Sequence, residues 1–246
     1  MKTSITFHRV AVFLLAVVVA SRAAGDAPKL YHDLAHEETP LAKPMKTIAD
    51  KVGLAVVESK EPIAADALRG VRLLYLRAPS KEFTPPEREA IIAFVRGGGS
   101  LLLVLDEESR QSLAVTRVND LIAPFGLKLS PDLPYLHNCG GLAKAGAINA
   151  ADREIPFSGG RAVEGGTPFA YVLDKDGKPA EAFAASASLP NGARIVVIGE
   201  GMVSLFLGKP GAERLTGVSR DPAHTTYWGK DSANFMEEVV TWLVKK

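Results

Sequence analysis

Two histidines and an aspartate stand close together in the stretch YHDLAHEE, residues 31–38. His32 and His36 are four residues apart, the spacing that places two imidazoles on one face of a zinc-binding helix. Asp33 lies between them. The same residue types can instead hydrogen-bond a loop and cap the helix that follows. The stretch therefore indicates either a metal or ligand site, or a polar loop that organises the chain after a first strand.

A metal site here needs further ligands, and the sequence spacing selects none of them. The candidates are Glu37, Glu38, Asp106, His137 and His224. The stretch also lies at the end of a predicted strand and lacks the apolar flanks of a core metal-binding helix. We therefore predict no cofactor, and we keep a divalent metal at the His32 cluster as the alternative.

Acidic residues follow an apolar run in LVLDEES, at Asp106, Glu107 and Glu108. Adjacent carboxylates in a cleft shift each other's pKa values and can serve as general acid or base. Acidic residues at the start of a helix also stabilise its N-terminus, and we favour this second role. Glu200 and Ser204 follow a later apolar run in the same way.

Two further groups of chemically capable residues lie in the second half of the chain. His137 is two residues from Cys139, which suggests a thiol–imidazole pair, although a lone cysteine is most often a small buried residue. His224 and Trp228 stand just before the last predicted helix. Aromatic side chains there could stack on a sugar or a partner side chain, or pin the loop to the core.

Alternating strands and helices must position these residues. Predicted strands cover 29–33, 54–59, 71–78, 100–109 and 193–201, and predicted helices cover 43–52, 62–69, 85–96, 114–125 and 231–246. The helix at 85–96 has the clearest start, because Thr84 is followed by Pro85 and by Glu87 in the pattern of a capping box. Runs such as LLLVL are apolar on both faces, which is typical of buried parallel strands.

This alternation predicts an α/β fold with a doubly wound, mostly parallel sheet of the flavodoxin-like type. Residues of about 128–192 are rich in Gly, Pro and Asp, which predicts an antiparallel β elaboration before the last core strand. Ligands bind such sheets beyond the carboxyl ends of the strands. The candidate ligand-binding residues at that edge are His32, Asp33, His36, Asp106, Glu107, Glu200, Ser204, His224 and Trp228.

The first 25 residues have the layout of a secretory signal peptide. Lys2, His8 and Arg9 precede an unbroken apolar run, residues 10–20, and small residues follow it. The run is short for a transmembrane helix. We therefore predict a leader at 1–25, a single domain at 26–246, no membrane span after cleavage, and a secreted or periplasmic location.

Charge and cysteine content exclude some functions. The chain carries 29 basic residues, and removing Lys2, Arg9 and Arg22 with the leader leaves 26 against 28 acidic ones. This balance gives no electrostatic reason to expect nucleic acid as a partner. The single cysteine, Cys139, cannot form an internal disulfide, so the core must stabilise the domain.

The combined pattern resembles the class I glutamine amidotransferase-like superfamily. The resemblance is carried by LLYLRAP, FTPPEREAIIAFVRGGGSLLLVLDEES and RIVVIGEGMVS, and it covers about residues 29–126 and 193–246. It is nearest to the non-catalytic branch, which includes gliding-motility and ABC-transporter auxiliary domains, an intraflagellar-transport domain and exported bacterial proteins of unknown function. The resemblance implies an amidotransferase-like α/β domain.

Catalytic members of that superfamily carry a nucleophilic cysteine on the turn after a central strand. Here that turn begins with Asp106 and Glu107, so the nucleophile is absent. We therefore expect a non-catalytic domain that binds a small molecule, a glycan or an envelope protein at the strand-end cleft. A metal-assisted hydrolase using His32, Asp33 and His36, or a cell-envelope scaffold, is the alternative.

Overall fold

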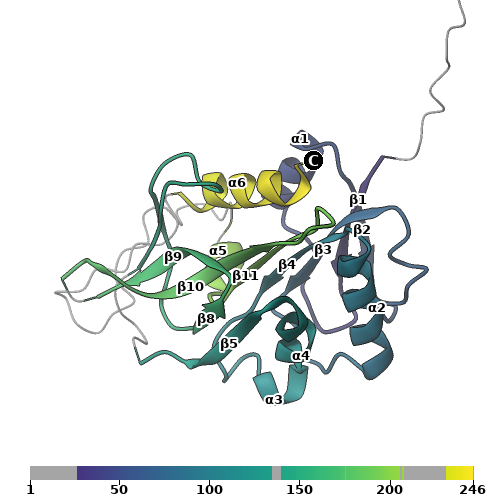
Figure 1. The fold of residues 1–246 in the computed structure, drawn as a ribbon, viewed down its shortest axis with the longest axis horizontal. Helices are drawn as coiled ribbons and strands as arrows, with labels where there is room; N and C mark the ends of the chain where they lie inside the picture. Colours follow the sequence, from purple (N-terminus) through teal and green to yellow (C-terminus); the bar gives the residue numbers. More distant parts are fainter. Residues whose placement is uncertain (1–26, 135–139, 175, 206, 208–230, 246) are drawn as a thin grey trace, which may run out of the picture.

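The structure, a computed structural model, describes residues 27–134, 140–174, 176–205, 207 and 231–245. Within these residues the largest element is a nine-stranded sheet of order β2-β1-β3-β4-β11-β10-β9-β6-β7 (Figure 1). Its strands are β1 Lys29–Asp33, β2 Ala55–Ser59, β3 Val71–Arg77, β4 Ser100–Val104, β6 Gly141–Ala143, β7 Arg153–Ile155, β9 Thr167–Leu173, β10 Pro179–Ser188 and β11 Arg194–Ile198. A separate pair joins β5 Leu127–Asp132 to β8 Arg161–Gly165.

The sheet has a parallel half and an antiparallel half. β2, β1, β3, β4 and β11 pair in parallel, for example Tyr31 with Leu74 and Val197 with Leu103. This order is compatible with a flavodoxin-like fold. β10, β9, β6 and β7 continue the sheet by antiparallel pairing, and all four come from the segment in which the sequence predicts an elaboration.

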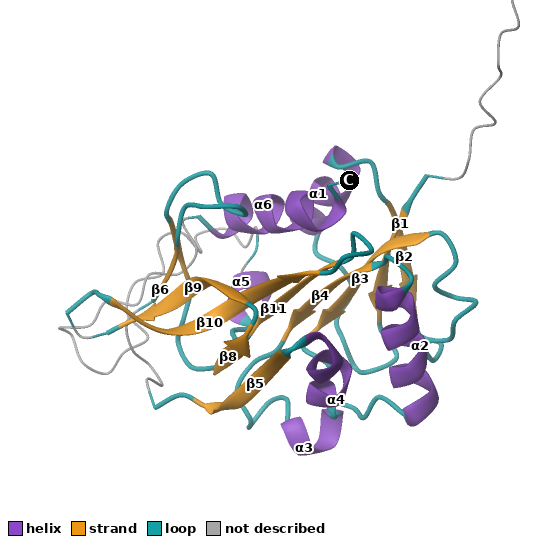
Figure 2. Ribbon diagram, in the orientation of Figure 1, coloured by secondary structure: helices purple, strands orange, loops and turns teal. Residues whose placement is uncertain are grey.

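Helices cover both faces of the sheet (Figure 2). They are α1 Lys43–Lys51, α2 Pro85–Arg96, α3 Leu113–Thr116, α4 Val118–Ile122, the 3-10 turn η1 Ala123–Phe125, α5 Met202–Leu205 and α6 Ser232–Val244. Met45 of α1 and Phe235 of α6 lie in one buried hydrophobic cluster, whereas Ile91 of α2 and Leu121 of α4 lie in the other. The fold is thus mixed α/β with a large, mixed sheet.

The start of α2 follows the predicted capping chemistry. Glu87 reaches back, and its Oε2 accepts hydrogen bonds from the backbone N–H and the hydroxyl of Thr84 at 2.9 and 2.7 Å. Pro85 is the first helical residue. The other Glu87 oxygen accepts the Ile63 N–H at 3.0 Å, so this buried carboxylate also fixes the loop before β3.

Several predicted boundaries differ from the structure. The strand predicted at 100–109 ends at Val104, because Asp106 N–H turns to the side chain of Gln111. The helix predicted at 114–125 is divided, with Arg117 in the left-handed region at φ 59°. No helix forms at the predicted residues 62–69, where the chain is irregular at 62–64 and forms turns at 65–70.

The predicted signal peptide at 1–25 lies outside the described residues. In the part of the chain that the structure covers, no helix is long and apolar enough to cross a membrane.

Candidate binding cleft

A small cleft of about 210 Å³ opens where the parallel strands end. It is lined by the loops after β1, β3 and β4 and by the start of α5, through Glu37, Glu38, Thr39, Arg77, Ala78, Ser80, Asp106, Arg110, Gln111, Gly201 and Ser204. Ligands bind parallel α/β sheets at this carboxyl edge. We call this cavity the strand-end cleft.

Two cleft residues have a backbone conformation that residues other than glycine rarely adopt. Glu37 has φ 66° and Ala78 has φ 52°, both in the left-handed region. Hydrogen bonds hold the loops in place, from Ala78 N–H to Val104 O at 2.8 Å and from Ser80 N–H to His36 O at 3.0 Å. Such strain concentrates at functional sites, so these outliers mark the cleft as a candidate.

The predicted histidine cluster lies beneath the cleft and does not line it. His32, Asp33 and His36 are all buried. Asp33 Oδ2 accepts a hydrogen bond from His36 Nδ1 at 2.6 Å, and the His36 ring stacks on Phe83 with centroids 3.9 Å apart. The cluster therefore supports the loop that carries Glu37 and Glu38.

The ring nitrogens of His32 also contact protein atoms. Nε2 donates to Thr39 O at 2.8 Å, and Nδ1 lies 3.4 Å from Tyr75 O. Burial lowers the pKa of His32, which favours the neutral ring. Among the described residues, no three His, Cys, Asp or Glu side chains gather as metal ligands. The geometry thus gives no support to a metal at this cluster.

Asp106 and Glu200 form a pair of interacting acids at the base of the cleft. Glu200 is fully buried; burial and, secondly, the charge of Asp106 raise its pKa to about 8. Burial likewise raises the pKa of Asp106. Glu200 Oε2 accepts the Ser158 N–H at 2.8 Å, and Oε1 accepts the Met202 N–H at 2.9 Å. Glu200 therefore ties the end of β11 to the neighbouring loop, while Asp106 lines the cleft.

Of the other predicted site residues, some lie in or near the cleft and the rest lie outside the residues that the structure describes. Ser204 lines the cleft and donates to Gly201 O at 2.9 Å. Glu107 Oε1 accepts from Arg110 Nε at 3.1 Å. The structure thus places Asp106 and Ser204 in the cleft wall. His224, Trp228, His137 and Cys139 lie outside the described residues. Ligand binding by all nine residues stays a prediction.

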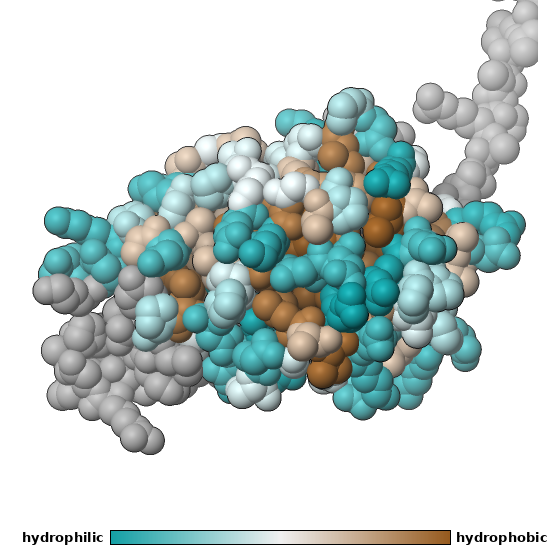
Figure 3. All heavy atoms as spheres, turned by 60° about the horizontal axis from the view of Figure 1, so that its bottom comes forward, coloured by the Kyte–Doolittle hydropathy of each residue, from teal (hydrophilic) through white to brown (hydrophobic). Residues whose placement is uncertain are grey.

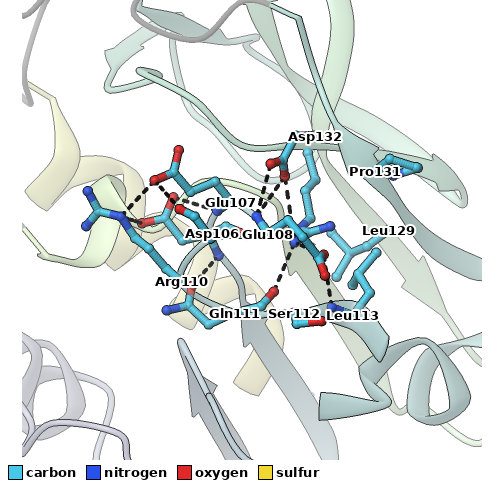
Figure 4. A network of polar contacts seen from close by, with 12 residues as sticks. Asp106, Glu107, Glu108, Arg110, Gln111, Ser112, Leu113, Leu129, Pro131 and Asp132 are labelled. Atoms are coloured by element: carbon cyan, nitrogen blue, oxygen red, sulfur yellow. Dashed lines mark hydrogen bonds and ion pairs between the residues drawn. The ribbon is translucent and has the colours of Figure 1, made fainter. Parts of the chain in front are cut away.

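Arg161 is a central residue of the site that sequence reasoning missed. Its side chain is fully buried, and it donates to Asp106 O at 2.8 Å, Gln111 O at 2.9 Å and Glu108 Oε2 at 2.7 Å. The loop after β4 that it holds is drawn in Figure 4, where Glu108 faces Asp132. Glu108 N–H contacts that carboxylate at 2.9 Å. Arg161 thus shapes the cleft wall from the antiparallel half of the fold.

A sequence signal for Arg161 does exist in the two glycines before it. A Cβ at Gly160 would lie 2.1 Å from Gly199 O, so only glycine allows β8 to approach the end of β11 this closely. The Arg161 N–H bonds Gly199 O at 2.8 Å as a result.

Comparison with known proteins places this geometry in context. Residues 31–139 match the family described as the IFT52 GIFT domain. The intraflagellar transport protein 52 homologs of Mus musculus and Homo sapiens are 28% and 27% identical to this chain over 156 residues. The match covers 61% of this chain and 34% and 33% of the two relatives. The chain therefore spans about a third of the length of the curated relatives it matches.

Solved structures share the fold. A structure described as the mmIFT52 N-terminal domain superposes with a TM-score of 0.66 at 17% identity, covering 89% of this chain and 98% of that one. An exo-β-1,4-mannosidase from an Opitutaceae bacterium superposes with a TM-score of 0.51 at 11% identity, covering 90% of this chain and 36% of that one. At these identities the likeness concerns the fold alone.

These matches confirm the intraflagellar-transport part of the predicted resemblance, because residues 31–139 are similar to the IFT52 GIFT domain. Membership of the wider amidotransferase-like superfamily stays a prediction. The predicted secreted or periplasmic location is contradicted, because the matched relatives are intraflagellar transport proteins. The prediction depended on a short apolar pattern at residues 10–20, which carries no information about the folded domain.

Proposed function

We propose that this chain is a non-catalytic binding domain that recognises a protein partner at the strand-end cleft. The observation that carries the proposal is the position of the cleft within the GIFT-like part. All lining residues except Gly201 and Ser204 fall within residues 31–139, the stretch that matches the GIFT family. The curated relatives are named as transport proteins and not as enzymes, which favours a role in protein interaction.

The size of the cleft favours a protein side chain over a larger free ligand. Pockets for drug-sized molecules usually enclose ~300–1,000 Å³, whereas this cleft holds about 210 Å³. A partner that inserts one side chain or a chain terminus fits this space. A glycan or small molecule is the other predicted class of ligand, and only part of a drug-sized ligand would fit in this cleft.

The polar groups of the cleft support binding more than catalysis. If the predicted amidotransferase-like resemblance holds, Asp106 takes the position at which the catalytic members carry cysteine. The Ser204 hydroxyl donates to Gly201 O at 2.9 Å, so it is not oriented toward a general base. The hydrolase alternative depends on His32, Asp33 and His36, whose burial separates them from the cleft.

Site-specific photo-crosslinking tests this function. Ser80 in the cleft is replaced by p-benzoylphenylalanine in the full chain, expressed in its native cells, and Lys178 in the exposed β9–β10 turn is the matched control. We expect a covalent protein adduct from position 80 and none from position 178. The proposal is wrong if position 80 gives no adduct, or if both positions give the same one.

A further inference from the structure

We propose that the strand-end cleft binds a carboxylate group of the partner through the guanidinium of Arg77. The inference rests on the proposed binding function and names the chemistry that the partner must present, which is an acidic side chain or a chain terminus. Arg77 is the last residue of β3, so its side chain starts at the carboxyl edge of the parallel strands.

The guanidinium of Arg77 is oriented by neutral groups. Its Nε donates to Ser204 Oγ at 3.2 Å, and its Nη1 donates to Thr39 Oγ1. Both acceptors are hydroxyls from other walls of the cleft. Among the described residues, Arg77 forms no ion pair with a carboxylate. Among the residues that the structure describes, its positive charge therefore has no ion-pair partner in the cleft.

The other cations at the cleft are already paired. Arg110 Nε lies 3.1 Å from Glu107 Oε1 and 3.9 Å from Asp106 Oδ2. Lys81 Nζ lies 3.0 Å from Glu37 Oε1 at the rim. Arg77 thus differs from both neighbours, and an incoming anion meets its charge first.

The carboxyl group of Glu38 contacts the backbone of Arg77. Glu38 Oε2 accepts the backbone N–H of Arg77 at 2.7 Å and not the guanidinium. Its Oε1 is buried and has no hydrogen-bond partner among the described residues. Burial raises the pKa of Glu38 well above its usual value, which favours the uncharged acid. A neutral Glu38 leaves the charge of Arg77 available to a ligand.

These features define the class of ligand. A guanidinium presents its N–H groups in a planar fork that matches a carboxylate in a bidentate arrangement. A half-buried cation without a counter-ion is costly to desolvate, and a carboxylate in the cleft would offset that cost. A second cation or an apolar group would leave Arg77 unpaired, so the cleft should reject both.

Titration with small anions tests the site. The ¹H–¹⁵N spectrum of the full chain is followed on adding N-acetyl-L-glutamate at constant ionic strength, with N-acetyl-L-glutamine as the neutral probe and inorganic phosphate as the free-anion probe. We expect saturable shifts of the Arg77 Nε–H and of the residue 78–80 amides with N-acetyl-L-glutamate. The neutral probe should give none. Equal binding of both amino acid probes, or phosphate binding more tightly than the carboxylate, would overturn the proposal.

Two arginine variants localise the effect. Arg77→Gln should weaken N-acetyl-L-glutamate binding at least fivefold, whereas Arg153→Gln, at a paired arginine of β7 that does not line the cleft, should change it less than twofold. Unchanged binding to Arg77→Gln, or equal losses in both variants, contradicts the assignment. If Arg77→Gln does not fold, Arg77→Lys serves instead, because it keeps the charge and loses the fork; it should bind at least twofold more weakly.

The crosslinking result separates this inference from the proposed function. If Arg77→Gln still gives the adduct from position 80 at full yield, the chain binds a protein at the cleft, but Arg77 does not recognise it. If the wild-type chain gives no adduct from position 80, the proposed binding of a protein partner is wrong. The proposal that the partner presents a carboxylate is then wrong too, even where the anion titration shows binding.

Discussion

Asp33 organises the first loop of the site although no solvent reaches it. Its Oδ1 accepts the Ala35 N–H at 2.9 Å, and its Oδ2 pairs with buried His36 at 2.6 Å. This is the loop-organising alternative that the sequence left open beside the metal site. His36 Nε2 in turn lies 3.5 Å from Glu87 Oε1, and this contact connects the loop to the start of α2.

Replacing Asp33 with alanine should therefore destabilise the domain. Asp33→Ala leaves the ring of His36 and the Ala35 N–H without their acceptor in a buried setting, which costs about 1–3 kcal/mol. Urea denaturation measures the change in the free energy of unfolding. The control is Asp66→Ala, an exposed ion-pair residue, for which a change below about 0.5 kcal/mol is expected. Equal effects of the two variants would contradict the role given to Asp33.

Glu200 makes stability depend on pH. Its pKa is about 8 in the folded chain against 4.5 for an ordinary glutamate, so between these values the folded state holds a proton that the unfolded state has lost. Stability from this group therefore falls as pH rises from 4.5 to 8, by at most about 1.4 kcal/mol per pH unit.

Glu200→Gln should flatten that dependence. We expect wild-type protein to lose about 1–2 kcal/mol of unfolding free energy between pH 6 and 8, and the variant to lose clearly less, measured by urea denaturation at both values. Glu82→Gln, at an exposed ion pair, is the control and should keep the wild-type slope. A variant as pH-dependent as wild type would show that Glu200 does not titrate in this range.

At the residue scale the sequence predicts the local hydrogen-bonding role of a side chain better than it predicts whether that side chain is buried. The capping role of Glu87 follows from local spacing, because its partner Thr84 is three residues away. The burial of His32 and His36 depends on Phe83 and Tyr75, which reach them only through the tertiary fold. The role of Arg161 depends on a loop more than fifty residues distant, with Asp106 O as an acceptor. Spacing along the chain carries no such information.

The loop after β4 is the element that most directly shapes the cleft. It carries Asp106, Arg110 and Gln111 of the lining, and Arg161 of β8 holds its backbone. The antiparallel elaboration therefore has a direct connection to the site and is not a separate decoration of the sheet.

Removing this connection should loosen the loop selectively. Arg161→Met leaves buried carbonyl oxygens of the loop without donors, at a cost of about 2–3 kcal/mol. Hydrogen exchange followed by mass spectrometry should show faster exchange in a peptide covering residues 106–111. Arg153→Met on β7 breaks a partly buried ion pair with Glu238 and is the matched control. Unchanged exchange in the loop, or the same acceleration in the control, would argue against the role of Arg161.

At the element scale the apolar runs locate the core strands well. Runs at β3, β4 and β11 are buried on both faces, so their composition alone is distinctive. The division of the helix between α3 and α4 was missed, since Arg117 at φ 59° has no local signature. The pairing of β6 with β9 joins strands that β7 and β8 separate in the chain, and local patterns do not encode it.

The whole molecule combines a parallel half that builds the cleft with an antiparallel half that braces it. Both faces of the sheet carry a buried hydrophobic cluster, and on the face in Figure 3 hydrophilic and hydrophobic residues are interspersed. The GIFT-like match runs from within β1 through β5, so it includes β3, β4 and the loop after β4. A binding role centred on the cleft therefore involves the part of the chain that its relatives share.

Blocking the cleft is the most direct test of this account. The partner recovered by crosslinking from position 80 is titrated against wild-type chain, against Ser80→Trp, which fills the cleft, and against Thr47→Trp, which adds the same bulk on exposed α1. We predict that Kd rises at least tenfold for Ser80→Trp and changes less than twofold for Thr47→Trp. Equal affinity of the wild type and Ser80→Trp would contradict binding at the strand-end cleft.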